Sequence, residues 1–208
     1  MSNKIDFSFI SALEGGQHLK GYVPAAGVSK SGVTVGTGFD LGARNEADLK
    51  RLALGAPLRE KLKPYLGKKA ADAKALIKKS PLTITQLEAD EIDKAVKSAA
   101  TKKLISAYDL AVGTTSPKFA SLIAAAQTVI ASVSYQYGDL AKKAPKFWKA
   151  ATAQDWPETI KILKNFGDAY RTRRGKEAAL LEKATATAAA AAPTAASTTA
   201  AAATAKNP

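Results

Sequence analysis

The sequence predicts an α+β protein that is predominantly helical, with one small antiparallel sheet near the N-terminus. Residues that favour strands cluster between positions 21 and 40 and are not found in such density elsewhere. Helix start and stop signals then follow one another from Asn45 to the region of Arg174. The last segment, 184–208, consists of Ala, Thr and Pro with single Ser, Lys and Asn residues. We therefore expect one folded domain over residues 1–183 and a disordered, flexible tail over 184–208.

The N-terminal part predicts a short helix followed by the sheet. Residues 5–13 place Ile5, Phe9 and Leu13 on one side of a helix, which Gly15-Gly16 should end. The sheet is expected over 21–40, with β-type residues at 22–24 and 33–35 and a turn at 29–32.

A helical bundle is expected from Asn45 onward. Asn45 can cap the first of its helices, Thr85 to Glu88 forms a capping box, and Asp155 can cap a later helix. The expected helical segments are 46–54, 58–66, 69–78, 86 to about 110, 117–137, 156–166 and a last one after Asp168. The long helix should turn inward Leu87, Ile92, Ala95, Val96, Ala99 and Leu104.

The composition excludes several kinds of functional site and indicates the charge of the partner. The chain of 208 residues has no Cys and one His, which excludes disulfides, Cys nucleophiles and multi-His metal sites. Its formal net charge of +13 favours an anionic partner such as nucleic acid, anionic lipid or a cell-wall polymer. The longest apolar run, 119–133, is too short for a bilayer, and residues 1–13 lack a secretory signal. We expect a chain that is made without an export signal and does not insert into membranes.

The segment from Ser31 to Gly42, SGVTVGTGFDLG, is the most informative one. If it is one continuous strand, Thr34, Gly36, Gly38 and Asp40 share a face, because side chains alternate along a strand. The two glycines would leave a bare floor for a flat polar polymer such as a glycan. The glycine spacing does not match a dinucleotide-binding loop.

Glu14 is the candidate acid. It ends the first predicted helix, where the free carbonyl groups and apolar neighbours such as Phe9 and Leu13 should raise its pKa. A carboxyl that stays protonated near neutral pH can protonate a glycosidic oxygen. Asp40 is the nearest candidate for the second, ionised carboxylate of a glycosidase.

These segments resemble pesticin-type lysozymes, bacterial toxins related in fold to phage lysozymes. The resemblance rests on Glu14-Gly15, Gly21-Tyr22-Val23-Pro24 and Ser31–Gly42, and more weakly on 129–138, Trp148, Trp156 and 171–177. It covers about residues 5–182 and implies a lysozyme-like fold with a β lobe and a helical lobe. It also implies muramidase activity on the β-1,4 bond between N-acetylmuramic acid and N-acetylglucosamine of peptidoglycan.

The resemblance assigns roles to individual residues. It implies that Glu14 is the general acid and that Thr34 and Asp40 complete the catalytic site. Tyr22, Gly36, Gly38, Gln136 and Tyr137 are expected to bind the substrate, and His18 to lie near the cleft at the surface. No metal or cofactor is implied. We expect a monomer that acts on the cell wall after holin-type release or secretion-system delivery, with an immunity protein as a possible partner.

One departure and two alternatives stand beside this prediction. Phage lysozymes carry an Asp between the acidic Glu and the Thr, whereas residues 15–33 contain no acidic residue. The first alternative is a basic domain that binds nucleic acid without catalysis. Two features argue against it: the tail has a single Lys, and the chain lacks the interleaving of aromatic and basic residues that is typical of single-strand binding. The second is a lysozyme fold that binds glycan without cleaving it.

Overall fold

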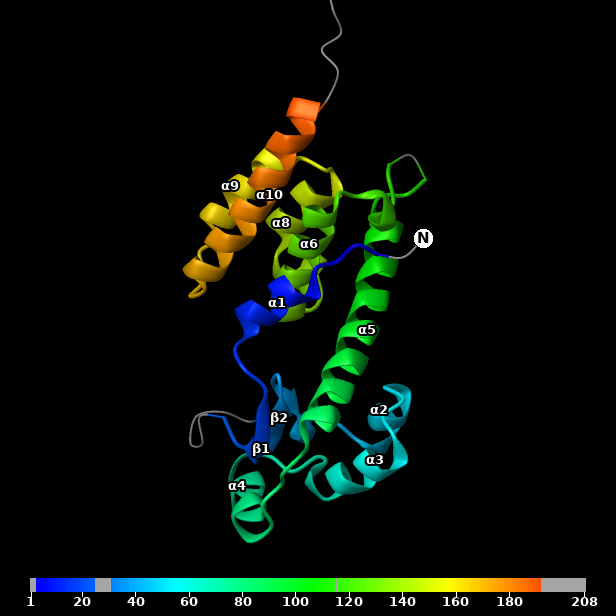
Figure 1. Cartoon of the computed structure of the whole chain (residues 1–208), viewed down its shortest axis with the longest axis vertical. Helices are drawn as coiled ribbons and strands as arrows, with labels where there is room; N and C mark the ends of the chain where they lie inside the picture. Colours follow the sequence, from blue (N-terminus) through cyan, green and yellow to red (C-terminus); the bar gives the residue numbers. More distant parts are fainter. Residues whose placement is uncertain (1–2, 25–30, 115, 192–208) are drawn as a thin grey trace, which may run out of the picture.

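Two lobes joined by one long helix make up the molecule. The computed structural model describes residues 3–24, 31–114 and 116–191. Helix α5 (Gln86–Ala111) extends from the lower lobe, which contains the sheet, to the upper, helical lobe (Figure 1). Helix α1 (Phe7–Glu14) comes before the sheet in sequence but packs on the helical lobe, so the chain crosses between the lobes directly after Glu14.

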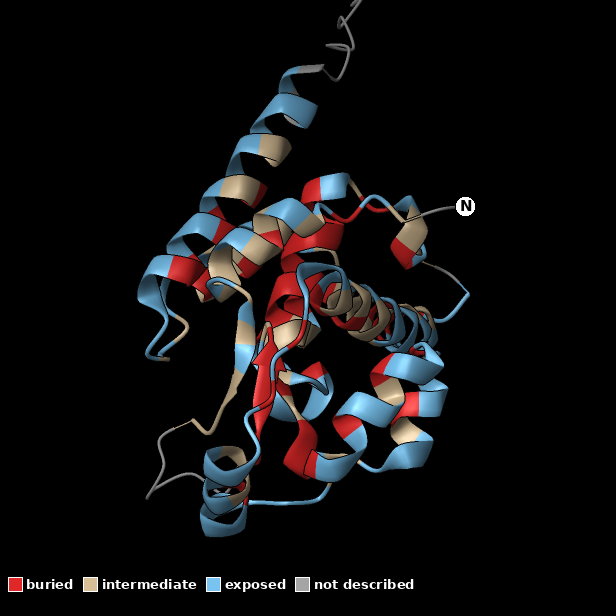
Figure 2. Ribbon diagram, turned by 60° about the horizontal axis from the view of Figure 1, so that its bottom comes forward, coloured by how far each residue is buried: buried red, intermediate tan, exposed pale blue. Residues whose placement is uncertain are grey.

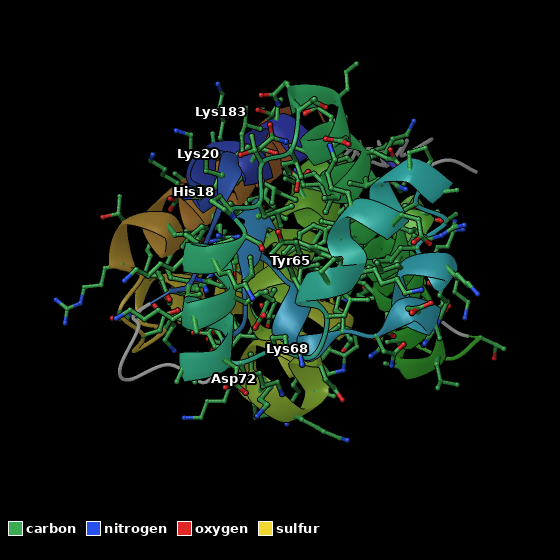
Figure 3. The ribbon with its side chains drawn as sticks, turned by 90° about the horizontal axis from the view of Figure 1, so that it is seen from below. His18, Lys20, Tyr65, Lys68, Asp72 and Lys183 are labelled. Atoms are coloured by element: carbon green, nitrogen blue, oxygen red, sulfur yellow. The ribbon has the colours of Figure 1, made fainter. Side chains whose placement is uncertain are left out.

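The smaller lobe contains the sheet and three short helices. Strands β1 (His18–Tyr22), β2 (Thr34–Gly36) and β3 (Phe39–Asp40) form an antiparallel sheet in that order, with Thr34 opposite Asp40. Helices α2 (Glu46–Arg51), α3 (Ala56–Leu62) and α4 (Ala70–Lys79) and the 3₁₀ turns η1 (Leu41–Ala43) and η2 (Lys63–Tyr65) follow. In the view from below, Tyr65 lies between α3 and α4, and His18 and Lys20 lie together at the edge of the lobe (Figure 3).

The larger lobe is built around helix α6 (Ala124–Tyr137), whose residues 125–133 are all buried. Five helices pack around α6 or around one another: α1, α5, α8 (Pro145–Thr152), α9 (Trp156–Lys164) and α10 (Arg171–Ala191). The buried residues gather at the centre of the lobe (Figure 2). The 3₁₀ turn η3 (Phe119–Ser121) precedes α6, and α7 (Leu140–Lys143) follows it. Residues 125–133 of α6 are buried on every side, and its buried polar side chains, among them Gln127 and Thr128, form hydrogen bonds.

The capping signals in the sequence are confirmed. Asn45 and Thr85 each form a complete capping box, at the starts of α2 and α5. Asp155 accepts a hydrogen bond from the backbone N–H of Glu158 at the start of α9. The predominantly helical α+β fold with a small antiparallel sheet is likewise confirmed.

Two expectations about the helices are wrong. The apolar helix does not begin at Ser116-Pro117, because the chain first forms η3 and enters α6 only at Ala124. Leu87 and Ala99 of α5 are exposed rather than inward, Leu87 by 80%. The reason is that α5 packs against both lobes in turn, so one continuous apolar stripe does not describe its buried face.

The segment 34–40 is a hairpin rather than one strand. Gly36 and Gly38 have positive φ angles of 56° and 81°, and the chain reverses between β2 and β3 at Thr37-Gly38. Thr34 and Asp40 are therefore opposite one another on two paired strands, and their side chains share a face, as expected. The continuous floor with Gly36 and Gly38 between them does not form, because the chain turns there. Thr37 lies in this turn, whereas Thr34 lies within strand β2.

The C-terminal helix is longer than expected. Helix α10 continues through Ala191, past the predicted boundary at residue 183. The remainder of the predicted tail, 192–208, and the first half of the predicted turn at 29–32 lie outside the described residues. Within the parts of the chain that the structure describes, no helix has the length and apolar character needed to cross a membrane.

Candidate active site

A groove lies where α1, the β2–β3 hairpin, α5 and α10 meet. It consists of three adjoining pockets of about 880, 180 and 590 Å³. Thr37, at the tip of the hairpin, lines all three pockets, and Glu14 lines the first two. The groove therefore runs past both residues, between the two lobes.

Glu14 is held at the junction of the lobes by its place in the sequence. It is the last residue of α1, and Gly15 turns the chain away with a positive φ of 81°. Its side chain is 19% exposed, and Oε1 lies 3.8 Å from Nη2 of Arg173 in α10. A carboxyl in this position is open to a ligand in the groove but largely withdrawn from bulk water.

The pKa of Glu14 is raised above its usual value, chiefly because burial disfavours the charged form. The positive charges of Arg173 and Lys97 oppose this effect, whereas the negative charge of Asp93 adds to it. The prediction that Glu14 has a raised pKa is thus supported. Burial is the main cause of the raised pKa. The prediction from the sequence had named the free carbonyl groups at the helix end first.

Arg173 is itself fixed by a buried network on α10 and α6. Its Nε donates to Glu177 at 3.1 Å and its Nη2 donates to the backbone oxygen of Ser132 at 3.0 Å. Glu177 is fully buried and also pairs with Arg174, which in turn pairs with Asp168 at 2.9 Å. This network anchors α10 to α6 and so sets the position of the guanidinium that faces Glu14.

Thr37 and Asp93 form a second polar centre in the groove. The Thr37 hydroxyl donates to Oδ2 of Asp93 at 2.5 Å, and the Thr37 backbone N–H donates to Oδ1 at 3.2 Å. Gln17 Nε2 also donates to Oδ2, at 2.8 Å. Since Asp93 lies on α5, these bonds tie the hairpin tip to the long helix. Asp93 and Glu14 both line the small pocket of about 180 Å³.

Thr34 and Asp40 are placed behind the hairpin tip. Thr34 is 2% exposed, and its hydroxyl donates to the backbone oxygen of Gly32 at 3.3 Å. Oδ1 of Asp40 accepts the backbone N–H groups of Gly32 at 2.9 Å and Gly42 at 2.8 Å. Among the described residues that line the three pockets of the groove, neither Thr34 nor Asp40 is found. Their catalytic roles stay predictions.

The residues predicted to bind substrate divide into two groups. Tyr22, Gly38 and Gln136 line the largest of the three pockets, as does the exposed His18. The rings of His18 and Tyr22 are in contact at an inclined angle of 50°, with centroids 4.5 Å apart. Gly36 and Tyr137 line none of the three pockets, within the part of the chain that is described. Gly36 is buried, and the Tyr137 hydroxyl donates to Asp168 at 2.7 Å, beneath Arg174.

Some groove residues were not found from the sequence. Asp93, Lys97 and Tyr135 come from helices far along the chain, and Tyr135 binds Lys97 O and Thr101 through its hydroxyl. No local motif marks them, because their role depends on which helices pack beside α1. Thr37 could have been found, since a tight hairpin turn at Gly36–Gly38 would have put it at the tip.

A half-buried Glu at the end of the first helix, in a groove between a β lobe and a helical lobe, is the arrangement expected of a lysozyme-like protein. The chain belongs to the Pesticin family: residues 4–157 match the family described as a bacterial toxin homologue of phage lysozyme, C-terminal part. The matched range includes Glu14, Thr37, Asp40 and Asp93 but ends before Arg173. A comparison with curated proteins finds no match to the chain.

Proposed function

We propose that the protein is a muramidase that hydrolyses the β-1,4 bond between N-acetylmuramic acid and N-acetylglucosamine in peptidoglycan. The observation that carries this proposal is Glu14: a carboxyl with a raised pKa, 19% exposed, in a groove between two lobes. Membership of a family of lysozyme homologues supports the same reaction. The groove extends over three adjoining pockets, which leaves room for more than one sugar unit of a polymer.

Glu14 supplies the proton for bond cleavage. Its protonated carboxyl gives the proton to the glycosidic oxygen as the bond to the sugar carbon breaks. A water oxygen then bonds to that carbon, and the proton that the water loses restores the carboxyl of Glu14. One water is consumed, and the enzyme returns to its starting state.

The charge of the chain suits the polymer. The formal net charge is +13, and Lys94 and Lys97 line the groove beside Asp93. Stem peptides and wall polymers carry carboxylates or phosphates, so electrostatic attraction brings the wall to this surface. His18 and Tyr22 offer two adjacent aromatic rings at the largest pocket, against which a sugar ring can pack.

The biological setting is part of the proposal. The family description as a bacterial toxin favours an antibacterial role, in which an immunity protein would protect the producer. Release as a phage endolysin is the other setting that this chemistry suits. In both settings the chain acts as a monomer on the cell wall after delivery by another system.

Digestion of purified peptidoglycan with the full chain tests the proposal. After borohydride reduction, mass spectrometry should show reduced N-acetylmuramic acid at the new ends. Reduced N-acetylglucosamine would indicate cleavage of the other glycosidic bond, and anhydro ends would indicate cleavage without water; both would contradict the proposal. Absence of any cleavage, with tight and salt-sensitive DNA binding, would favour the nucleic-acid alternative.

Glu14→Gln is the decisive variant. The amide keeps the shape of the side chain but has no proton to donate, so we expect the products to disappear while the thermal unfolding transition remains. Glu182→Gln is the matched control, because Glu182 pairs with Lys164 at the surface of α10. It should retain full activity. Undiminished cleavage by Glu14→Gln would overturn the proposed role of Glu14.

A further inference from the structure

Asp93 binds the tip of the β2–β3 hairpin through both of its carboxylate oxygens. Oδ2 accepts the hydroxyl of Thr37 and the amide of Gln17, and Oδ1 accepts the backbone N–H of Thr37. The glycine at position 36 permits this approach, because a Cβ there would lie 3.2 Å from Oδ1. The carboxylate is thus fixed in orientation by three donors.

The Thr37 hydroxyl is oriented by this contact. A hydroxyl has one hydrogen to donate and two lone pairs that accept. Since its hydrogen is directed to Asp93, the oxygen can only accept from a group in the groove. Thr34 is different, because its hydroxyl is buried and donates to Gly32 within the sheet.

We propose that Thr37 and Asp93 position the water that attacks the sugar carbon. The Thr37 oxygen accepts a hydrogen bond from this water, which leaves the lone pair of the water free to face the carbon. Asp93 acts through Thr37 and is a positioning residue. The inference rests on the proposed hydrolysis, and it adds a pair of residues to the three that the family resemblance implies.

The placement of the pair beside Glu14 supports this assignment. Thr37, Asp93 and Glu14 all line the pocket of about 180 Å³, between the hairpin, α5 and α6. Thr37 also lines the two larger pockets, so the three pockets meet at this residue. A water in it can therefore reach a glycan that lies along the groove, close to the acid that protonates the leaving oxygen.

Asp93 also acts on Glu14 through its charge. The charged and titratable groups facing Glu14 are Asp93 and Lys97 from α5, Arg173 from α10 and Tyr135 from α6. Arg44, His18 and Lys176 lie further along the same two pockets. The negative charge of Asp93 raises the pKa of Glu14, whereas Arg173 and Lys97 lower it. Removing the charge of Asp93 alone should therefore lower the pKa of the acid.

The experiment compares four variants of the full chain by steady-state kinetics on soluble peptidoglycan fragments. Thr37→Val and Asp93→Asn should each lower kcat by about 10- to 100-fold with KM changed less than about twofold, because positioning of the water matters after the substrate has bound. Thr37→Ser keeps the hydroxyl and should retain most of kcat. Glu91→Gln is the matched control.

Glu91 is an acidic residue of the same helix that contacts the small lobe but does not line the groove. It lies on the same helix and accepts a backbone N–H of the small lobe, that of Gly55 at 2.6 Å. Glu91→Gln should leave kcat and KM unchanged. If Glu91→Gln and Asp93→Asn lower both kcat and the melting temperature to the same extent, the role of Asp93 is structural and the inference is wrong.

The pH profile provides a readout that a structural role would not move. The alkaline limb of kcat should shift to lower pH in Asp93→Asn, and it should stay in place in Thr37→Val, which keeps the charge of Asp93. If Glu14→Gln is inactive but Thr37→Val and Asp93→Asn retain kcat, the inference fails and the muramidase proposal stands. If Glu14→Gln remains active, the proposed function itself fails.

Discussion

The guanidinium of Arg173 lies 3.8 Å from the carboxyl of Glu14, so the last helix of the chain contacts the last residue of the first helix. Arg173 is buried and held by Glu177 and Ser132, which leaves it little freedom to follow a movement of Glu14. The acid of the groove is therefore positioned by a helix that is more than 150 residues away in sequence.

Glu14→Gln should stabilise the protein at neutral pH. The pKa of Glu14 is raised in the folded state, so folding favours the protonated form. The contribution of Glu14 to the free energy of unfolding of the wild type is therefore fully present below the pKa of Glu14 in the unfolded chain. It is lost as the pH rises through the pKa of Glu14 in the folded chain. The neutral amide avoids this loss.

Thermal unfolding of both proteins across the acidic to neutral range measures the effect. The difference in melting temperature should be largest at neutral pH and should vanish where Glu14 is protonated in both folded and unfolded chains. A difference that does not depend on pH would show that packing, rather than the charge, separates the two proteins.

Lys97→Met should shift the alkaline limb of activity to higher pH. Lys97 lowers the pKa of Glu14, so removal of its charge leaves the acid protonated over a wider range. The Met side chain preserves much of the aliphatic contact, although the hydrogen bond from Nζ to Ser11 at 2.6 Å is lost. Lys103→Met, at an exposed position of the same helix, is the control and should leave the profile unchanged.

Glu177→Ala should cost about 3–5 kcal/mol of the free energy of unfolding, because it leaves two buried guanidinium groups without their common partner. Glu182→Ala removes an exposed ion pair on the same helix and should cost less than about 1 kcal/mol. Denaturant titration of both variants checks this difference, and equal losses would contradict the buried role of Glu177.

Gly32→Ala should destabilise the small lobe by about 3 kcal/mol or more, since a Cβ there would lie 2.4 Å from the backbone of Gly42. Gly175→Ala should do the opposite. It lies within α10 with open space around it, so Ala should add up to about 1 kcal/mol of stability. Denaturant unfolding measures both, and a stable Gly32→Ala protein would contradict the close backbone contact.

Asp40 can be tested by two substitutions. Asp40→Asn retains an oxygen that can accept the N–H groups of Gly32 and Gly42, so the fold should keep its stability to within about 1 kcal/mol. Asp40→Ala leaves both amides without this acceptor and should cost about 1–3 kcal/mol. Equal stability of the two variants would contradict the structural contact.

The activity of the folded Asp40→Asn protein then tests the role that the family resemblance implies. Loss of kcat at unchanged stability would support catalysis by Asp40 in addition to its backbone contacts. Wild-type activity would assign this carboxylate to the shape of the hairpin alone.

Local features of the sequence predicted the elements well where short-range interactions decide them. Asn45, Thr85 and Asp155 cap their helices with bonds to residues three positions away, so these contacts form whatever the rest of the chain does. Leu87 shows the limit. Leu87 fits the apolar pattern of α5, but among the described residues no element covers it, and it is exposed. Which face of α5 is buried depends on how the two lobes pack against the helix.

The sequence by itself determined the fold class, the small N-terminal sheet and the place of Glu14 at the end of the first helix, because caps, glycines and apolar periodicity act over a few residues. Helices α7 and α8 were not predicted. The tertiary structure decided which groups face that acid. Thr37 enters the groove only because the hairpin reverses at its tip, and Asp93, Lys97 and Arg173 enter it only because α5 and α10 pack beside α1. Contacts between side chains so distant in sequence are fixed by packing of whole helices, which no local pattern encodes.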